Sequence, residues 1–455
     1  MKVLLYQTEM NPGNMKGVYY FGPGAIAAYL KEKGHDVHFR TVNNTALDKE
    51  DFLSEIQRID PGLIGFSVMT DEWFYVAKLV AWIKEKFDIP IICGGAHPTM
   101  APEKVIANEN VDMLCRGEGE YPLEELCACL DEGRDYRQIQ NLWVKDGEKV
   151  FSNPLRPLIE NLDDLPFPDT EMLDFQKILR ENDYIARFMV RRGCPFECTY
   201  CINQGIHKLY RGKGKLVRRR SPERVIEGLK AIADKYSEIQ GIGFDDDIFA
   251  LDKNWLRRFC RLYSEEIGLP FSCYMRIERI DREFLEIVKN AGCTWLDIGL
   301  ESGNEWLRRT ILNRKMSNAE IIQKFGVIDA FEIETTSLNM VGPPYETVEM
   351  LEETIELNRR IKPTCLIAGP FQPYPGTKLG ELCIERGWFS DDGMEFVDRS
   401  VSVLNLPALT RAEISYYAHR LNHAGHAIRA KKAPVGAYDF LSHLEEADIE
   451  QSSEG

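Results

Sequence analysis

Residues 192–201 read Arg192-Gly193-Cys194-Pro195-Phe196-Glu197-Cys198-Thr199-Tyr200-Cys201, so three cysteines fall within eight residues. Thiolates are soft ligands that suit iron–sulfur clusters or zinc. A cubane cluster needs four thiolates, but the next cysteine along the chain is Cys260. A cubane held by this segment would therefore keep one iron open for a substrate or cofactor.

Two other interpretations of this segment stay open on spacing alone. One is a zinc site in which His207 completes a Cys3His ligand set. The other is three unrelated thiols, because free cysteine is often a core residue. Three unrelated thiols at this density would be unusual, which favours a metal site.

The composition is that of a globular protein without nucleic-acid or membrane partners. The chain has 455 residues, room for two domains, and is 44% hydrophobic. No apolar run is long enough to span a bilayer, and the start resembles a first strand rather than a signal peptide. The net charge of −16 disfavours phosphate binding, and twelve cysteines in such a chain indicate metal or redox chemistry rather than disulfides. We expect a cytoplasmic protein.

One basic run, from Lys208 to Arg220, opposes the acidic trend. It is either a solvated loop or a docking patch for an acidic electron donor or an anionic substrate.

The first 135 residues alternate short apolar strands with amphipathic helices. Strands are expected at 2–6, 37–42, 63–68, 91–93 and 111–115, with helices at 24–33, 49–58, 72–86 and 121–132. This alternation predicts a doubly wound, flavodoxin-like parallel sheet with ligands at the carboxyl ends of its strands. Those ends are rich in small residues, at 67–70, 94–99 and 117–120. Glycines there either let the backbone approach a ligand or form tight turns.

Residues 136–182 are expected to be a linker, because the segment 161–169 is turn-rich and punctuated by prolines. From 183 to 385 the alternation resumes, with strands expected at 185–190, 241–244, 271–275, 295–300, 337–341 and 365–371. Six strands with crossover helices predict a partial (β/α)6 barrel, whose chemistry lies at the carboxyl ends of the strands. Residues 386–455 are expected to form a small helical region.

Polar motifs follow the barrel strands. Asp246 lies among three adjacent carboxylates, which suit polar contacts to a ligand or a helix cap better than a metal site. Arg276 could pair with a ligand carboxylate or form a structural ion pair. Glu301 and Ser302 lie between glycines, a pattern that suits recognition of a ribose diol.

The Cys-x3-Cys-x2-Cys spacing, with Tyr200 before the last cysteine, resembles the signature of the radical SAM superfamily. The resemblance implies that the three cysteines hold a [4Fe-4S] cluster whose fourth iron is chelated by S-adenosylmethionine (SAM). Reduction by the cluster would cleave SAM to a 5′-deoxyadenosyl radical. The segment 299–303 resembles the family's Gly-x-Glu-Ser-Gly motif, which contacts SAM, and 342–347 and 371–377 resemble its substrate-side motifs.

The N-terminal half resembles the cobalamin-binding domain of the subfamily that includes the anaerobic cyclase of chlorophyll synthesis. The matching pieces are Pro-Gly-Ala-x3-Tyr-Leu, Gly-His-Asp-Val, Gly-Gly-x-His-Pro-Thr and Gly-Glu-Gly-Glu. Many cobalamin domains supply a lower cobalt ligand from an Asp-x-His-x2-Gly loop after the first strand. Residues 7–11 contain no histidine, and Asp36-Val37-His38 lacks the glycine. We therefore expect cobalamin without a histidine ligand.

These patterns and resemblances define four groups of candidate residues. The metal ligands are Cys194, Cys198 and Cys201. The candidates for holding SAM are Tyr200, Asp246, Arg276, Glu301, Ser302 and Gly303. The candidates for holding cobalamin are Ser67, Met69, Thr70, Gly94, Gly95, Ala96, Gly117 and Glu118. The substrate-side candidates are Pro373 and Tyr374, and no catalytic side chain is expected beyond the cofactors.

The resemblance covers roughly residues 1–385 and implies a radical SAM enzyme, cobalamin-dependent, that methylates or rearranges an unactivated carbon of a small molecule. It further implies a monomer that takes electrons from a flavodoxin or ferredoxin. The alternatives are a radical SAM enzyme without cobalamin, a methylthiotransferase, or a non-catalytic zinc or corrinoid-binding module. A methylthiotransferase would carry further cluster cysteines in its N-terminal domain, a pattern that this sequence lacks.

Overall fold

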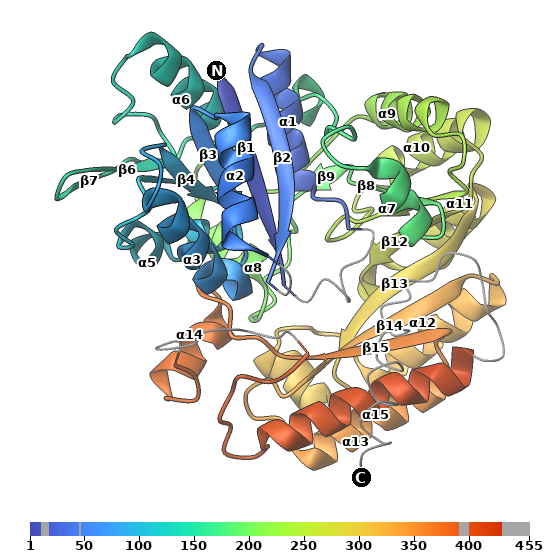
Figure 1. Ribbon diagram of the computed structural model, residues 1–455. Helices are drawn as coiled ribbons and strands as arrows, with labels where there is room; N and C mark the ends of the chain where they lie inside the picture. The colour runs from blue at the N-terminus through green and yellow to red at the C-terminus, as the bar shows by residue number, and fades with distance from the viewer. Residues whose placement is uncertain (11–17, 45–46, 391–399, 430–455) are drawn as a thin grey trace.

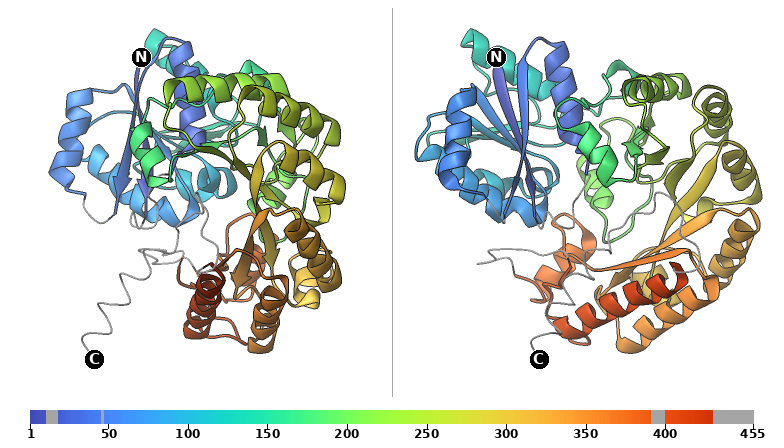
Figure 2. Two further views of the ribbon diagram at one scale, coloured as in Figure 1. Left: turned by 90° about the vertical axis from the view of Figure 1, so that its right-hand side faces the viewer. Right: turned by 45° about the vertical axis from the view of Figure 1, so that its right-hand side comes forward.

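A computed structural model describes residues 1–10, 18–44, 47–390 and 400–429. The chain forms two α/β units that lie side by side, an N-terminal sheet and a second, open sheet (Figure 1). A helix near the carboxyl end of the described chain packs along the last strand of the second sheet, as Figure 2 shows from two further sides.

The N-terminal sheet has the strand order β2-β1-β3-β4-β5-β6-β7. Its first five strands are parallel, and their order confirms the flavodoxin-like prediction. These strands are β1 (Lys2–Glu9), β2 (Asp36–Asn43), β3 (Leu63–Ser67), β4 (Ile91–Gly94) and β5 (Met113–Cys115). The helices between them are α1 (Phe21–Glu32), α2 (Lys49–Ile59), α3 (Trp73–Lys84), α4 (Ala96–Met100), α5 (Pro102–Ile106) and α6 (Glu120–Glu132). Apolar side chains bury both faces of the sheet, as parallel strands require.

The segment expected to be a linker instead extends this sheet. Strands β6 (Leu142–Asp146) and β7 (Lys149–Ser152) form a hairpin, and β6 pairs antiparallel with β5. Leu142 and Val144 are buried while their neighbours are more exposed, so the hairpin covers the sheet edge with one face. The remainder of the segment carries a short 3-10 turn, η3 (Leu162–Asp164), and the helix α7 (Phe175–Glu181).

The second sheet has six parallel strands in the order β15-β14-β13-β12-β11-β8, an open half-barrel as predicted. Its strands are β8 (Ile185–Phe188), β11 (Gly241–Phe244), β12 (Phe271–Met275), β13 (Cys293–Glu301), β14 (Glu334–Val341) and β15 (Cys365–Pro370). The crossover helices are α9 (Pro222–Lys235), α10 (Lys253–Glu266), α11 (Arg282–Asn290), α12 (Asn318–Ala330) and α13 (Val348–Ile361). The Ser221 hydroxyl caps α9, and Ser317 with Glu320 forms a capping box on α12.

Three short elements connect the cysteine segment to the rest. A two-stranded ribbon pairs β9 (Arg191–Arg192) with β10 (Arg218–Arg219), and α8 (Ile202–Leu209) follows the cysteines. Helices α14 (Lys378–Glu385) and α15 (Arg411–Arg429) follow β15, and Asn422 bonds the backbone of Ala368 in that strand. Of the expected helical region at 386–455, residues 391–399 and 430–455 lie outside the described residues. Within the described ranges, no helix has the length and apolar character needed to cross a membrane.

Candidate active site

The chain that enters the cysteine segment is held by Asp246. Its carboxylate accepts hydrogen bonds from the backbone N–H of Val190 at 3.0 Å and of Arg191 at 2.7 Å. Asp246 is 1% exposed, and this burial raises its pKa to about 7. The predicted contact of Asp246 with SAM stays untested, and this geometry instead gives the residue a positioning role. Gly193 follows with φ +83°, where an added Cβ would lie 2.2 Å from the carbonyl oxygen of Leu216.

The three cysteines lie between β9 and α8, and hydrogen-bond donors point at two of the sulfurs. Arg276 Nη1 donates to Cys198 Sγ at 3.0 Å, and Asn203 Nδ2 donates to Cys201 Sγ at 3.6 Å. Burial raises the pKa of Cys194 to about 11, and coordination to a metal would favour its thiolate form. N–H donors aimed at sulfur are the surroundings that tune cluster thiolates. The donor set therefore fits an iron–sulfur cluster.

His207, the fourth ligand of the zinc alternative, has a different role. Its Nε2 donates to the backbone carbonyl of Cys194 at 2.6 Å. Among the described residues, no three His, Cys, Asp or Glu side chains are gathered as the ligands of a single metal ion. The Nε2 atom of His207 is therefore engaged with the backbone and is not placed as a fourth zinc ligand.

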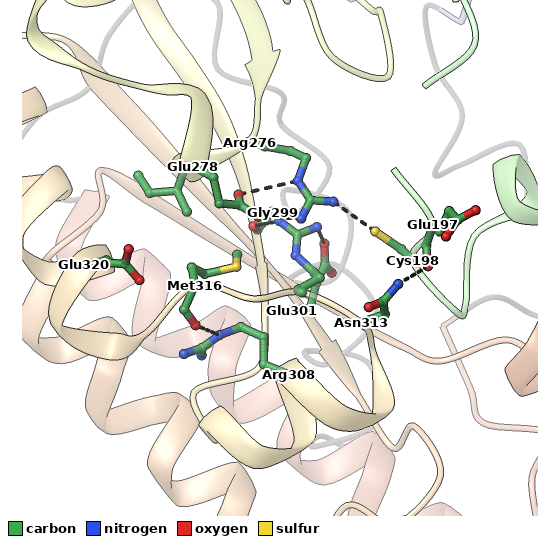
Figure 3. A network of polar contacts seen from close by, with 12 residues as sticks. Glu197, Cys198, Arg276, Glu278, Gly299, Glu301, Arg308, Asn313, Met316 and Glu320 are labelled. Atoms are coloured by element: carbon green, nitrogen blue, oxygen red, sulfur yellow. Dashed lines mark hydrogen bonds and ion pairs between the residues drawn. The ribbon is translucent and has the colours of Figure 1, made fainter. Parts of the chain in front are cut away.

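Arg276 follows β12 and links the cysteine segment to the barrel (Figure 3). Its guanidinium pairs with Glu278 and lies 3.8 Å from the ring centroid of Phe196 while it reaches Cys198. Thus Arg276 makes both a structural ion pair and a contact to a predicted cluster ligand.

Glu301, at the end of β13, is oriented by an arginine that sequence reasoning missed. Arg314 Nη1 donates to Glu301 Oε1 at 3.0 Å and to Tyr200 Oη at 3.1 Å, and Nη2 donates to the carbonyl of Gly299. Glu301 has φ +71°, a left-handed conformation that is strained for a residue with a side chain. Strain of this kind gathers at functional sites, which agrees with the predicted contact to SAM. A buried carboxylate needs a cation, but nothing in the sequence shows that Arg314 supplies it.

The next two residues of the motif pack into the protein. Ser302 is fully buried and its hydroxyl accepts from the N–H of Asn304. A Cβ on Gly303 would lie 2.3 Å from the carbonyl oxygen of Glu353, so glycine lets β13 approach α13. Both residues were predicted to hold SAM, and that prediction stays untested. In this structure the Ser302 side chain and the absence of a side chain at Gly303 serve packing.

The substrate-side candidates Pro373 and Tyr374 follow β15, in the loop that leads to α14. The Tyr374 carbonyl accepts from the Thr377 hydroxyl at 2.7 Å, and the N–H of Leu379 donates to the carbonyl of Thr199 at 3.0 Å. The loop therefore borders the site, and its predicted contact with substrate stays a prediction.

A cavity of about 330 Å³ lies between the carboxyl ends of the N-terminal strands and the segment that enters the cysteines. Of the residues predicted to hold cobalamin, five line it: Ser67, Gly94, Gly95, Gly117 and Glu118. The other three, Met69, Thr70 and Ala96, are not among the lining residues. Met69 instead begins the turn before α3, where its N–H bonds Glu72 and its side chain is exposed.

Glycines and apolar side chains dominate the cavity wall, a lining typical of small-molecule and cofactor sites. Gly117 has φ +78°, and a Cβ there would lie 1.7 Å from Tyr210 Oη. No histidine occurs among the lining residues of the described chain. The loop expected to lack a histidine ligand continues into residues 11–17, which lie outside the described residues.

The carboxylates of the Gly-Glu-Gly-Glu segment join the two α/β units. Glu118 Oε1 accepts from Arg192 Nη1 at 2.9 Å and from Arg218 Nη1 at 2.7 Å, and Oε2 accepts from the N–H of Ile159 at 2.8 Å. Glu120 pairs with the same Arg192. Burial would raise the pKa of Glu118, but Arg192 and Arg218 hold it below its usual value. The cavity wall is thus bonded to the residue that precedes Gly193 and Cys194.

The basic run at 208–220 is divided: Lys208, Arg211 and Lys215 are exposed, as a solvated loop requires, but other cations of the run turn inward, and the docking role stays a prediction. Arg218 and Arg220 are buried, and Arg220 donates to the carbonyls of Leu165 and Pro166. Lys213 likewise bonds the carbonyl of Leu155. These three cations hold the segment 155–166 in place.

Comparison with known proteins agrees with this arrangement. The B12 binding domain family matches residues 20–127, and the Radical SAM superfamily matches residues 189–357. An uncharacterized methyltransferase of Pyrococcus horikoshii is 29% identical over 392 residues, covering 84% of this chain and 83% of the relative. The anaerobic magnesium-protoporphyrin IX monomethyl ester cyclase of Rubrivivax gelatinosus is 25% identical over 397 residues, covering 83% and 69%.

Among solved structures, the radical S-adenosylmethionine methyltransferase TsrM of Kitasatospora setae, with cobalamin and a [4Fe-4S] cluster bound, has a TM-score of 0.69. The likeness covers 93% of this chain and 82% of TsrM at 16% identity, and it shows a shared fold. The two family matches cover the two α/β units in the expected order, with the cavity in the first and the cysteines in the second. The chain therefore belongs to the B12-binding radical SAM enzymes, relatives of the anaerobic magnesium-protoporphyrin cyclases and of the cobalamin-dependent radical SAM methyltransferases.

Proposed function

We propose that this enzyme transfers a methyl group to an unactivated carbon of a small-molecule substrate, with cobalamin in the cavity beside the cysteine segment. The observation that carries the proposal is the shared wall: Val190, Arg191 and Arg192 line the cavity and lead directly to Cys194. When bound, the cluster and SAM supply a 5′-deoxyadenosyl radical and cobalamin supplies a transferable methyl group.

The residues of the chain would divide the work as follows. Cys194, Cys198 and Cys201 would hold the cluster, and the donor from Arg276 would stabilise electron density on the Cys198 sulfur. Arg314 would orient Glu301 toward a polar group of SAM. The apolar side chains and glycines of the cavity would exclude water from the reacting centre, which protects a radical from side reactions.

Two relatives favour methyl transfer over other outcomes. Beside the archaeal methyltransferase, cytidylyl-2-hydroxyethylphosphonate methyltransferase of Streptomyces wedmorensis is 21% identical over 455 aligned residues. The cyclases support ring formation as a second candidate. A methylthiotransferase fits less well, because the N-terminal cysteines Cys93, Cys115, Cys127 and Cys129 are buried in the core rather than gathered at a site. We further propose an external one-electron donor of the flavodoxin or ferredoxin class.

The test uses protein purified and reconstituted without oxygen, then soaked with hydroxocobalamin and repurified. We expect about four irons per chain, stoichiometric cobalamin, reductant-dependent formation of 5′-deoxyadenosine, and transfer of the SAM methyl group to reduced cobalamin. Cys198→Ala should lose the cluster and the cleavage of SAM, while Cys260→Ala, a buried core cysteine of α10, should keep both. Iron without retained cobalamin would refute the methyl-transfer proposal, and a Cys198→Ala protein that still cleaves SAM would refute the cluster assignment.

A further inference from the structure

We propose that Arg191 forms an anion-binding subsite where the cavity meets the cysteine segment, for a carboxylate or phosphate group of a bound molecule. Arg191 lies on β9, three residues before Cys194, and is one of the residues that line the cavity. The ligand takes its identity from the proposed function, but binding of the anion is a separate property.

The donors of Arg191 are buried without acceptors. The residue is 2% exposed, and Nε, Nη1 and Nη2 each find no hydrogen-bond partner among the described residues. A guanidinium remains charged in proteins, so its burial without a partner is costly. Neighbouring arginines differ: Arg187 pairs with Asp245 at 2.6 Å, and Arg192 pairs with Glu118 at 2.9 Å.

The two carboxylates closest to Arg191, those of Asp246 and Asp247, already accept hydrogen bonds from other groups. Asp246 accepts the backbone N–H groups of Val190 and of Arg191 itself, and Asp247 accepts from Asn203 Nδ2 at 3.1 Å. The bonds of Asp246 hold it to the chain that enters the cysteine segment, and the bond of Asp247 holds it to α8, which follows the cysteines. The charge of Arg191 is therefore left for a ligand.

The charges of the cavity wall also favour an anion. Its charged side chains are Arg191, Arg192, Arg220, Glu118 and Glu120. Both glutamates are paired with Arg192, and Glu118 also accepts from Arg218. Arg220 donates to the neutral carbonyls of Leu165 and Pro166. Among the described residues, Arg191 and Arg220 are therefore two cations of the wall without a carboxylate hydrogen-bond partner. The planar fork of a guanidinium binds carboxylate or phosphate oxygens in pairs.

Two molecules could carry the anion, the phosphodiester of bound cobalamin or an acidic group of the substrate. Titration of reconstituted enzyme with cobalamin and with cobinamide, which lacks the nucleotide and its phosphate, isolates the first source. If the phosphodiester binds here, the wild type prefers cobalamin about tenfold or more and Arg191→Met loses the preference. If a substrate group binds here, cobalamin-loaded wild type binds inorganic phosphate and Arg191→Met does not.

Arg219→Met is the matched control, because Arg219 lies opposite Arg191 in the ribbon but pairs with Asp252 at 2.7 Å. It should behave as the wild type in both arms. Arg191→Met should also leave the ligand-free protein at least as resistant to urea as the wild type, because it removes an unpaired buried charge. Equal binding by wild type and Arg191→Met in both arms, or a marked loss of urea resistance in the variant, would overturn the proposal. Failure of the enzyme to retain corrinoid would count against the proposed function alone, since titration of the corrinoid-free protein and of its Arg191→Met variant with inorganic phosphate still tests the subsite.

Discussion

Replacement of Glu118 by glutamine tests whether this carboxylate holds the two α/β units together. Glu118 accepts three hydrogen bonds, from Arg192, Arg218 and the N–H of Ile159, at 2.7–2.9 Å. Glutamine keeps one acceptor oxygen, and its NH2 group then faces either the two guanidinium groups or the N–H of Ile159, which are donors in both cases. Hydrogen bonds to charged groups contribute about 1.5–3 kcal/mol each, and a broken buried ion pair costs about 3–5 kcal/mol. Because the Glu118 side chain is only 14% exposed, solvent screens little of this, and we expect a loss of about 3–5 kcal/mol in the free energy of unfolding.

Urea denaturation at pH 7, followed by tryptophan fluorescence, measures this loss. The control is Glu125→Gln, which breaks an ion pair with Arg156 at 2.9 Å whose carboxylate is 44% exposed, and it should cost less than about 1 kcal/mol. The folded-state pKa of Glu118 is lowered, so its contribution is complete above the unfolded pKa of about 4.3 and is lost as the pH falls through the folded pKa. The difference between wild type and Glu118→Gln should therefore shrink below about pH 4. If Glu118→Gln costs no more than Glu125→Gln, the carboxylate does not hold the units together.

Three further changes test other parts of the site. Gly303→Ala forces a Cβ to 2.3 Å from the Glu353 carbonyl and should lower the urea midpoint by the equivalent of about 2 kcal/mol or more; Gly326→Ala, with open space at its Cβ in α12, should be neutral or stabilising. Glu346 is buried and its pKa is raised to about 8, so the folded state keeps a proton that the unfolded state loses above about 4.3, and stability falls as the pH rises from about 4.5 to 8. Glu346→Gln should flatten that fall and exceed the wild type in urea resistance at pH 8; an unchanged pH profile would contradict this. Asp246→Asn weakens the hydrogen bonds that hold the chain before the cysteines. The affinity of the variant for iron should be about 10–100-fold lower than that of the wild type, as measured anaerobically by competition with a chelator.

Periodicity and motif spacing were enough to predict the sheet order of the N-terminal unit and the six parallel strands of the half-barrel. Buried parallel strands appear as short apolar runs, and each of those runs became a strand. The hairpin at 142–152 was missed although its signal is present: Gly147-Glu148 forms a two-residue connection between β6 and β7, with Gly147 at φ +59° as tight hairpins favour. The proline-punctuated segment 161–169, which follows the hairpin, led to the prediction that all of residues 136–182 form a linker.

The cysteines were predictable because ligand spacing is local in sequence. The partners that orient the site were not, because they come from distant segments. Arg314 reaches Tyr200 across 114 positions, and Arg192 reaches Glu118 across 74. For the same reason the Gly-Glu-Gly-Glu segment was recognised as part of a cofactor site while the ion pairs of its carboxylates were not.

The short segment 190–194 couples the cavity to the cysteines. Asp246 holds its first two N–H groups, Glu118 holds the side chain of its third residue, and His207 holds the carbonyl of its last. Five consecutive residues are thus held from three directions, and the contacts at 190–192 and at 194 restrain the chain between them. A displacement of the cavity wall at these residues should therefore be passed on to the first cysteine. If the proposed function holds, loosening these contacts should impair methyl transfer before it impairs the binding of either cofactor.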